Sequence, residues 1–166
     1  MKLTKVLFCA VAILALGVLP LSGQMSGQMS GNGQTHTKPT ESERNELLTV
    51  RLLVWNSYFD NDQKQLKKLI GEHFLTINPG EEHWQDKAEF LAGAQHFAEH
   101  HGKLVSLDFP KTEIQEFGDV AVLYSLVRIT MESDGKRESL NCRSTEVFHK
   151  REGQWVNTGA HVDSGR

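Results

Sequence analysis

The hydrophobic pattern of this chain changes its period at Gly102, and this change constrains the fold more than any other feature of the sequence. Before Gly102, apolar residues recur at the three- and four-residue spacing of amphipathic helices. After Gly102, they alternate with polar residues, and the segments become rich in β-branched side chains, as strands do. Helices that precede an antiparallel meander predict an α+β domain, with three N-terminal helices packed in a curved antiparallel sheet.

The helical part predicts three helices. The first begins after Thr40 and is followed by a second over residues 63–70, for which Asp62 is interpreted as an N-cap rather than a catalytic acid. A third helix is predicted over about residues 86–101. The apolar stripe of the first helix is expected at Leu48, Leu52, Trp55 and Phe59, and that of the third at Phe90, Ala94, Phe97 and Ala98.

The second part predicts five strands joined by short turns, over residues 104–109, 112–117, 121–132, 139–150 and 154–163. Along residues 121–131 both alternating faces are largely apolar. One face is therefore expected to pack on the helices and the other against a partner subunit, which predicts a homodimer through the outer sheet face.

The N-terminal residues predict a secretory signal peptide over residues 1–23. Lys2 and Lys5 precede an uncharged apolar run over residues 6–16, which is shorter than a membrane span. The chain is therefore expected to be exported, to the periplasm or beyond the cell, with no stable membrane span after cleavage; the alternative is an uncleaved anchor. Residues 24–39, rich in Gly, Ser, Gln and Met, predict a flexible linker before a domain over residues 40–166.

Composition and motifs exclude several classes of function. The formal net charge is −3 and no long basic run occurs, which argues against a dedicated nucleic-acid binder. No Gly-rich phosphate loop, nucleophile elbow or pair of metal-binding carboxylates is found, so no cofactor is expected. His96 and His100 share a helical face but lack an obvious third ligand, so no metal is expected either.

The end of the chain resembles a known family. Residues 145–155 (TEVFHKREGQW) and 161–165 (HVDSG) are similar to the closing strands of the association (hub) domain of calcium/calmodulin-dependent protein kinase II, and Arg128-Ile129-Thr130 resembles its preceding strand. Over about residues 41–165, the order of elements resembles the nuclear transport factor 2-like (NTF2-like) or SnoaL-like superfamily, of the type named domain of unknown function 4440. This resemblance implies a cone-shaped domain with a small-molecule pocket.

The resemblance also places candidate site residues. Steroid isomerases with this fold use a general base, a tyrosine and a protonated acid. In this chain, the position of the base is occupied by Asn78, that of the tyrosine lies near Val54, and that of the acid lies near Thr145. Asparagine takes no proton at neutral pH and valine donates no hydrogen bond, so these departures argue against that isomerisation. Asn78 and Thr145 are kept as ligand-binding candidates.

A different pocket is implied by the hub domain. Arg128 and Arg143 would bind an anionic ligand there, unless Asp163 pairs with one of them as a structural ion pair. His161 and Asp163 are expected to share a strand face with Trp155 and are the catalytic candidates, His161 as a general base; the alternative is a hydrogen-bonded core histidine.

Aromatic side chains complete the candidate pocket. Tyr58 and Tyr124 are further ligand-binding candidates, although aromatics at such spacing also serve as core residues. The sequence thus predicts an exported domain that binds a small polar or anionic molecule and supports weak lyase- or isomerase-type proton transfer. The alternative, from another functional class, is a non-catalytic assembly module.

Overall fold

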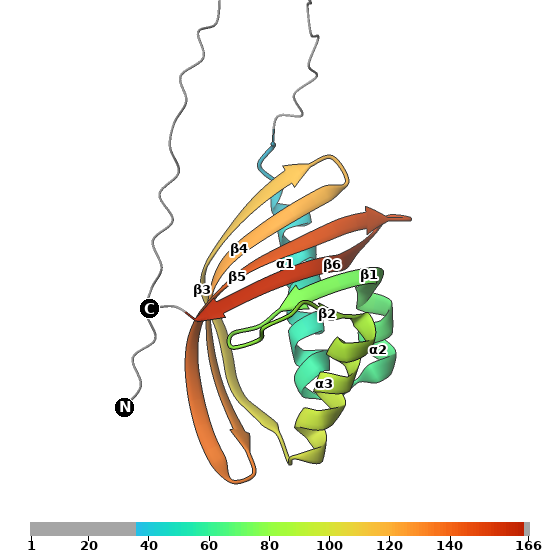
Figure 1. Cartoon of the computed structure of the whole chain (residues 1–166). Helices are drawn as coiled ribbons and strands as arrows, with labels where there is room; N and C mark the ends of the chain where they lie inside the picture. The colour runs from blue at the N-terminus through green and yellow to red at the C-terminus, as the bar shows by residue number, and fades with distance from the viewer. Residues whose placement is uncertain (1–35, 165–166) are drawn as a thin grey trace, which may run out of the picture. The chain divides into compact units, whose positions relative to one another are not determined.

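The computed structural model describes residues 36–164. Its three helices are α1 (Glu41–Phe59), α2 (Gln63–Leu69) and α3 (Lys87–Glu99), and its six strands are β1 (Ile70–Ile77), β2 (Gln85–Asp86), β3 (Lys103–Phe117), β4 (Val120–Ser133), β5 (Lys136–Arg151) and β6 (Gln154–Ser164). The strands form one sheet in the order β2-β1-β6-β5-β4-β3. Figure 1 shows the sheet curving, with the helices gathered on one side of it. The predicted α+β class is confirmed, whereas the predicted leader (1–23) and most of the predicted linker lie outside the described residues.

Each helix begins at a residue whose side chain accepts a hydrogen bond from one free backbone N–H group of the first turn. Thr40 and Asp86 form reciprocal capping boxes at the starts of α1 and α3. Asp62 accepts a hydrogen bond from the Gln65 N–H at 2.9 Å at the start of α2. Asp62 is therefore a helix cap, as the sequence predicts.

The buried face of α1 is rotated from the predicted stripe. Leu52 is exposed, and Arg51 is buried in its place with 4% of its surface accessible. The Arg51 guanidinium donates to the hydroxyls of Thr112 and Ser125, at 2.7 and 3.0 Å, and lies 3.7 Å from the centre of the Phe109 ring. These contacts compensate part of the cost of burying an arginine, a residue that a hydropathy pattern places on the surface. Arg51 Nε is buried and has no hydrogen-bond partner among the described residues.

The sheet differs from the prediction at two places. Residues 104–109 and 112–117 belong to one strand, β3, which is irregular between Asp108 and Lys111. Pro110, which lacks an N–H, lies in this irregularity, where no ladder hydrogen bond is needed from it. Neither β1 nor the short β2 was predicted, and β1 pairs in parallel with β6, so the sheet is not wholly antiparallel.

Strand β6 contains a bulge that decides which of its side chains face the helices. Phe148 pairs with Asn157 and Val147 with Gly159, so Thr158 is an extra residue in β6. Before the bulge, Trp155 and Asn157 are buried on the inner face, which is the face toward the helices. After it, the parity changes, and Val162 is the buried residue.

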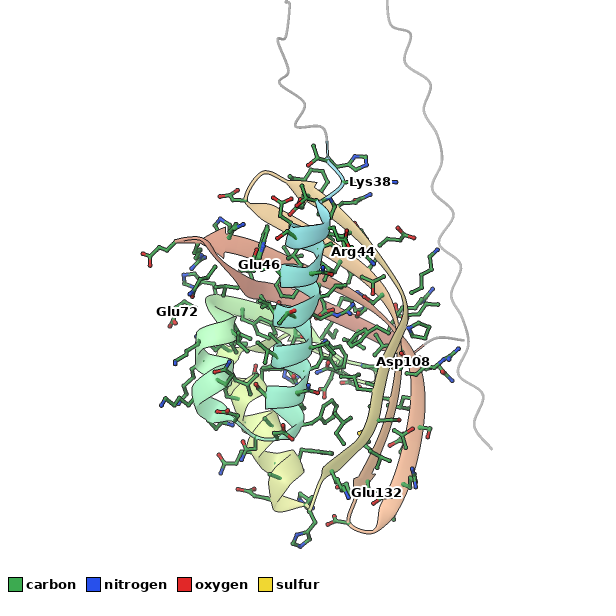
Figure 2. The ribbon with its side chains drawn as sticks, turned by 180° about the vertical axis from the view of Figure 1, so that it is seen from behind. Lys38, Arg44, Glu46, Glu72, Asp108 and Glu132 are labelled. Carbon is green, nitrogen blue, oxygen red and sulfur yellow. The ribbon has the colours of Figure 1, made fainter. Side chains whose placement is uncertain are left out.

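The core lies between the helices and the inner face of the sheet, where Figure 2 shows side chains filling the space between α1 and the strands. It is divided into three clusters of buried apolar residues, centred on Phe148, on Phe74 and on Val127. At the N-terminal side, Thr37 pairs with Glu116 through two backbone hydrogen bonds of 2.9 and 3.2 Å, so the end of the predicted linker is attached to β3. Within residues 36–164, no helix combines the length and the apolar character that crossing a membrane requires.

Candidate functional site

A pocket of about 320 Å³ lies between the helices and the inner face of the sheet. This volume is at the lower end of the range of small-molecule sites. Its walls come from two of the core clusters, with Val54 and Phe74 from one and Ile129 and Val162 from another. Six aromatic side chains contribute to the lining: Trp55, Tyr58, Phe59, Phe74, Phe90 and Phe97.

Glu146 on β5 is the buried carboxyl group of this pocket, with 1% of its surface accessible. The indole N–H of Trp55 donates to Glu146 Oε1 at 3.0 Å, and the Ser144 hydroxyl donates to Oε2 at 3.4 Å. Burial raises the pKa of Glu146 to about 7, against the opposing effects of the Trp55 hydrogen bond, the charge of Arg51 and the Ser144 hydrogen bond. A carboxyl group with such a pKa can both accept and release a proton near neutral pH.

Neutral polar groups lie around the same pocket. The amide of Asn157 and the hydroxyl of Thr76 are buried and line it from β6 and β1. Asn157 Oδ1 accepts a hydrogen bond from the Gly159 N–H at 3.0 Å, which ties this amide to the bulge. Burial raises the pKa of Tyr58, and the nearby charge of Glu81 acts in the same direction.

Two of the eight predicted site residues line this pocket. Tyr58 lies on α1, and Asn78 lies at the turn after β1, where its side-chain amide donates to Gln85 Oε1 at 3.2 Å. The Tyr58 hydroxyl lies close to Gly93 of α3, where an added Cβ would approach it to 2.9 Å. Both residues therefore line the pocket, and their role in binding a ligand stays a prediction.

The other six predicted residues lie on the outer face of the sheet, away from the helices. Tyr124, Thr145 and His161 form one row across β4, β5 and β6. His161 is exposed, and the centre of its ring lies 6.3 Å from the centre of the Trp84 ring. The expectation that His161 and Asp163 share a face with Trp155 is wrong, because the bulge at Thr158 reverses the alternation between them.

The predicted anion site in the cone is also corrected. Arg143 and Asp163 form an ion pair at 2.8 Å on the outer face, which is the structural alternative that the sequence left open. Arg128 also points outward, 4.0 Å from Asp108. Neither arginine lines the inner pocket. On β4 the neighbours Val127 and Ile129 are buried on the inside and Arg128 is exposed, and on β5 Cys142 and Glu146 face inward and Arg143 outward.

Sequence reasoning missed the residues that give the pocket its chemistry, namely Glu146, Trp55, Asn157 and Arg51. A signal for Glu146 was present, because it shares its strand parity with Cys142 and Phe148, and two apolar residues of one parity mark the inner face. Within residues 36–164, no group of three His, Cys, Asp or Glu side chains is arranged to hold a metal ion. The rings of His96 and His100 are in contact, with centres 4.3 Å apart and planes tilted by 60°, and His100 Nδ1 lies 2.8 Å from Asp134 Oδ2.

Solved structures with this fold come from several bacteria. An NTF2-like protein from Cytophaga hutchinsonii is 17% identical, with a TM-score of 0.65, over 74% of this chain and 98% of that one. A candidate calcium/calmodulin-dependent protein kinase II association domain from Xanthomonas campestris is 15% identical, with a TM-score of 0.65, over 78% and 92%. A candidate dehydratase of the NTF2-like family from Streptomyces avermitilis is 13% identical, with a TM-score of 0.61, over 75% and 97%. These likenesses show the fold.

Sequence comparison gives the family. No curated protein matches the chain significantly. The model of the SnoaL-like domain matches residues 53–162, which include the pocket from Val54 of α1 to Val162 of β6. The chain therefore belongs to the SnoaL-like domain family within the NTF2-like fold.

Proposed function

We propose that this protein binds a small, mostly apolar molecule in the inner pocket, with Glu146 as the polar group that orients it and exchanges a proton with it. The observation that carries the proposal is a carboxyl group with 1% surface exposure lining a cavity of about 320 Å³ whose other walls are largely aromatic and aliphatic. The lyase- or isomerase-type proton transfer expected from the sequence is thereby reassigned from His161 and Asp163 to Glu146. The dehydratase name of the Streptomyces avermitilis structure is in keeping with such chemistry.

The test uses two neighbouring residues of β6 that face opposite ways. Ala160 lines the pocket, whereas His161 is exposed on the outer face. A thermal-shift screen with carboxylates, steroids, lactones and amines should identify a ligand that stabilises the folded protein. At a concentration of ~100 times its Kd, the ligand should raise the free energy of unfolding by about 2.7 kcal/mol. Ala160→Phe should abolish this stabilisation by filling the cavity, and His161→Phe should retain it.

Circular dichroism of both variants checks that each is folded. Loss of the ligand response in His161→Phe together with its retention in Ala160→Phe would overturn the proposal and return the site to the outer face. Where Ala160→Phe does not fold, Ala160→Leu replaces it, because this smaller side chain still occupies part of the cavity.

A second candidate function is self-association through the outer face, and the observation that favours it is a set of exposed apolar side chains there. Tyr124 and Leu126 of β4 are 42% and 47% exposed, and Leu75 of β1 and the nearby Trp84 are also exposed. The Xanthomonas campestris structure is named as an association domain. We propose a homodimer in which two such faces pack together.

The oligomeric state tests this second candidate. Analytical ultracentrifugation of the wild type should give a dimer, and Leu126→Lys should give a monomer. Leu53→Lys is the matched control, because Leu53 of α1 is similarly exposed, at 40%, but lies on the helical side. A monomeric wild type, or a dimer that Leu126→Lys leaves unchanged, would contradict the proposed interface.

The proposed location rests on residues 1–23 of the sequence, and we propose export by cleavage of this leader. Mass spectrometry of the protein recovered outside the cytoplasm should give a mature N-terminus within about residues 18–27. Recovery of the intact N-terminus in a membrane fraction would instead support the anchored alternative.

A further inference from the structure

The ionisable side chains that line the inner pocket are mainly acidic. Its two carboxylic acids are Glu146, which is buried, and Glu81, which is exposed to solvent. Among the described residues that line this pocket, none is a lysine, arginine or histidine. An anion placed here would lose its hydration and meet Glu146 as a like charge, whereas a cation would meet an opposite charge.

Arg51 does not cancel this preference. Its guanidinium is directed to the Thr112 and Ser125 hydroxyls and to the Phe109 ring, and Arg51 is not a lining residue. The positive charge of Arg51 lowers the pKa of Glu146 without Arg51 lining the pocket, so the carboxyl group is the charge that a bound molecule contacts.

The aromatic walls favour the same kind of ligand. Trp55, Tyr58 and Phe90 line the pocket together with three further aromatic residues. The faces of such rings attract cations, most strongly where water is excluded. Trp55 and Ser144 use only part of the hydrogen-bonding capacity of Glu146, since a carboxylate offers about four acceptor sites.

We infer that the inner pocket selects a small apolar molecule that carries a protonated amine, with the ammonium group at Glu146 and the hydrocarbon part against the aromatic walls. This inference rests on the proposed function and specifies its ligand class. It replaces the polar or anionic ligand expected from the sequence, because the two arginines that suggested an anion lie on the outer face.

The test compares three probes of one shape and different charge: benzylamine, benzyl alcohol and benzoate. Isothermal titration of the purified chain at pH 8 should show benzylamine binding at least ~10-fold more tightly than benzyl alcohol, and no binding of benzoate. Glu146→Gln should weaken benzylamine by roughly 10- to 100-fold and leave benzyl alcohol within about 3-fold. Glu113→Gln is the matched control, because it removes the same charge from an exposed position on β3 that does not line the pocket.

The pH dependence gives a second readout. Because burial raises the pKa of Glu146 to about 7, a bound cation must displace the carboxyl proton below that pH. The affinity for benzylamine, which stays protonated from pH 5 to 8, should fall by up to about tenfold per pH unit below pH 7. In Glu146→Gln, the affinity should not change over this range.

The outcomes separate this inference from the proposed function. Benzyl alcohol or benzoate binding as tightly as benzylamine overturns the amine inference and leaves a ligand-binding pocket. An absence of binding by all three probes also overturns the inference, and the comparison of Ala160→Phe with His161→Phe then decides the proposed function independently.

Discussion

The indole N–H of Trp55 on α1 donates to Glu146 Oε1 on β5 across 3.0 Å, so the first helix is joined to the centre of the sheet by a hydrogen bond to a buried acid. The two residues are separated by 91 positions in sequence. The bond holds the carboxyl group at the pocket and stabilises its ionised form. The stability of the fold and the protonation of the site are therefore linked, and the linkage can be measured.

Glu146→Gln should flatten the pH dependence of stability. The folded protein binds a proton at Glu146 up to about pH 7, while the unfolded chain releases it near the ordinary value of 4.5, so the free energy of unfolding falls as pH rises through this window. The contribution of Glu146 to this fall is about 3 kcal/mol. Urea denaturation gives the free energy of unfolding of wild type and variant at each pH from 4.5 to 8. The difference between the two free energies should change by about this amount over that range. A constant difference would mean that Glu146 titrates normally.

Trp55→Phe should destabilise the protein more at pH 8 than at pH 5. At pH 8 the lost hydrogen bond is to a carboxylate and is worth about 1.5–3 kcal/mol, whereas at pH 5 it is to a protonated acid and is worth about 0.5–1.5 kcal/mol. The loss of packing is the same at both pH values and cancels in the comparison. Urea denaturation measures the loss of unfolding free energy at pH 5 and at pH 8. An equal loss at the two pH values would contradict the assigned role of the Trp55 indole.

Arg143→Ala should have little effect on stability or on ligand binding. The ion pair with Asp163 lies on the outer face, with its side chains 64% and 39% exposed, and such pairs contribute at most about 1 kcal/mol. Thermal unfolding at low and high salt should show that this small effect shrinks as salt rises. A ligand response that disappears in Arg143→Ala would instead support the anion site expected from the sequence.

Gly102→Ala should be destabilising by about 1–3 kcal/mol, because an added Cβ would overlap the carbonyl oxygen and ring of Phe97. Phe97 lines the pocket, so its displacement should also reduce ligand affinity. Gly71→Ala is the control, since a Cβ there meets its nearest atom at an ordinary 3.4 Å. Calorimetric melting of both variants gives the comparison, and equal melting temperatures would show that the chain around Phe97 adapts freely.

The helices were predictable from the sequence because their signals are local. A cap such as Thr40 or Asp62 acts within three residues of itself, so helix starts can be recognised without knowing the rest of the fold. The strand β1 was not recognised, because its partner residues on β6 lie 84 to 87 positions later in the chain and its own residues carry no clear alternation. The buried Arg51 was missed for a similar reason, since the hydroxyls that receive it belong to β3 and β4.

The candidate site was less predictable than the fold. Tyr58 and Asn78 line the inner pocket. Tyr58 was proposed from the helix period, and Asn78 from its match to the base position of the steroid isomerases. To predict which strand residues line the pocket, it was necessary to know which face of each strand points toward the helices. On β5 the predicted residues were Arg143 and Thr145, which share one face of the strand. Thr145 is one position from the buried Glu146, and in a strand one position means the opposite face.

The extra residue in β6 also affects how this chain should be aligned with its relatives. Consider two family members that differ by one in the number of residues between Asn157 and Ala160, with otherwise regular strand pairing. Identical side chains after this point will then lie on opposite faces of the sheet in the two proteins. A histidine aligned with His161 would then border a cavity in one protein and contact solvent in the other. Transfer of a catalytic role across this segment therefore depends on the parity of the gap as well as on the identity of the aligned residue.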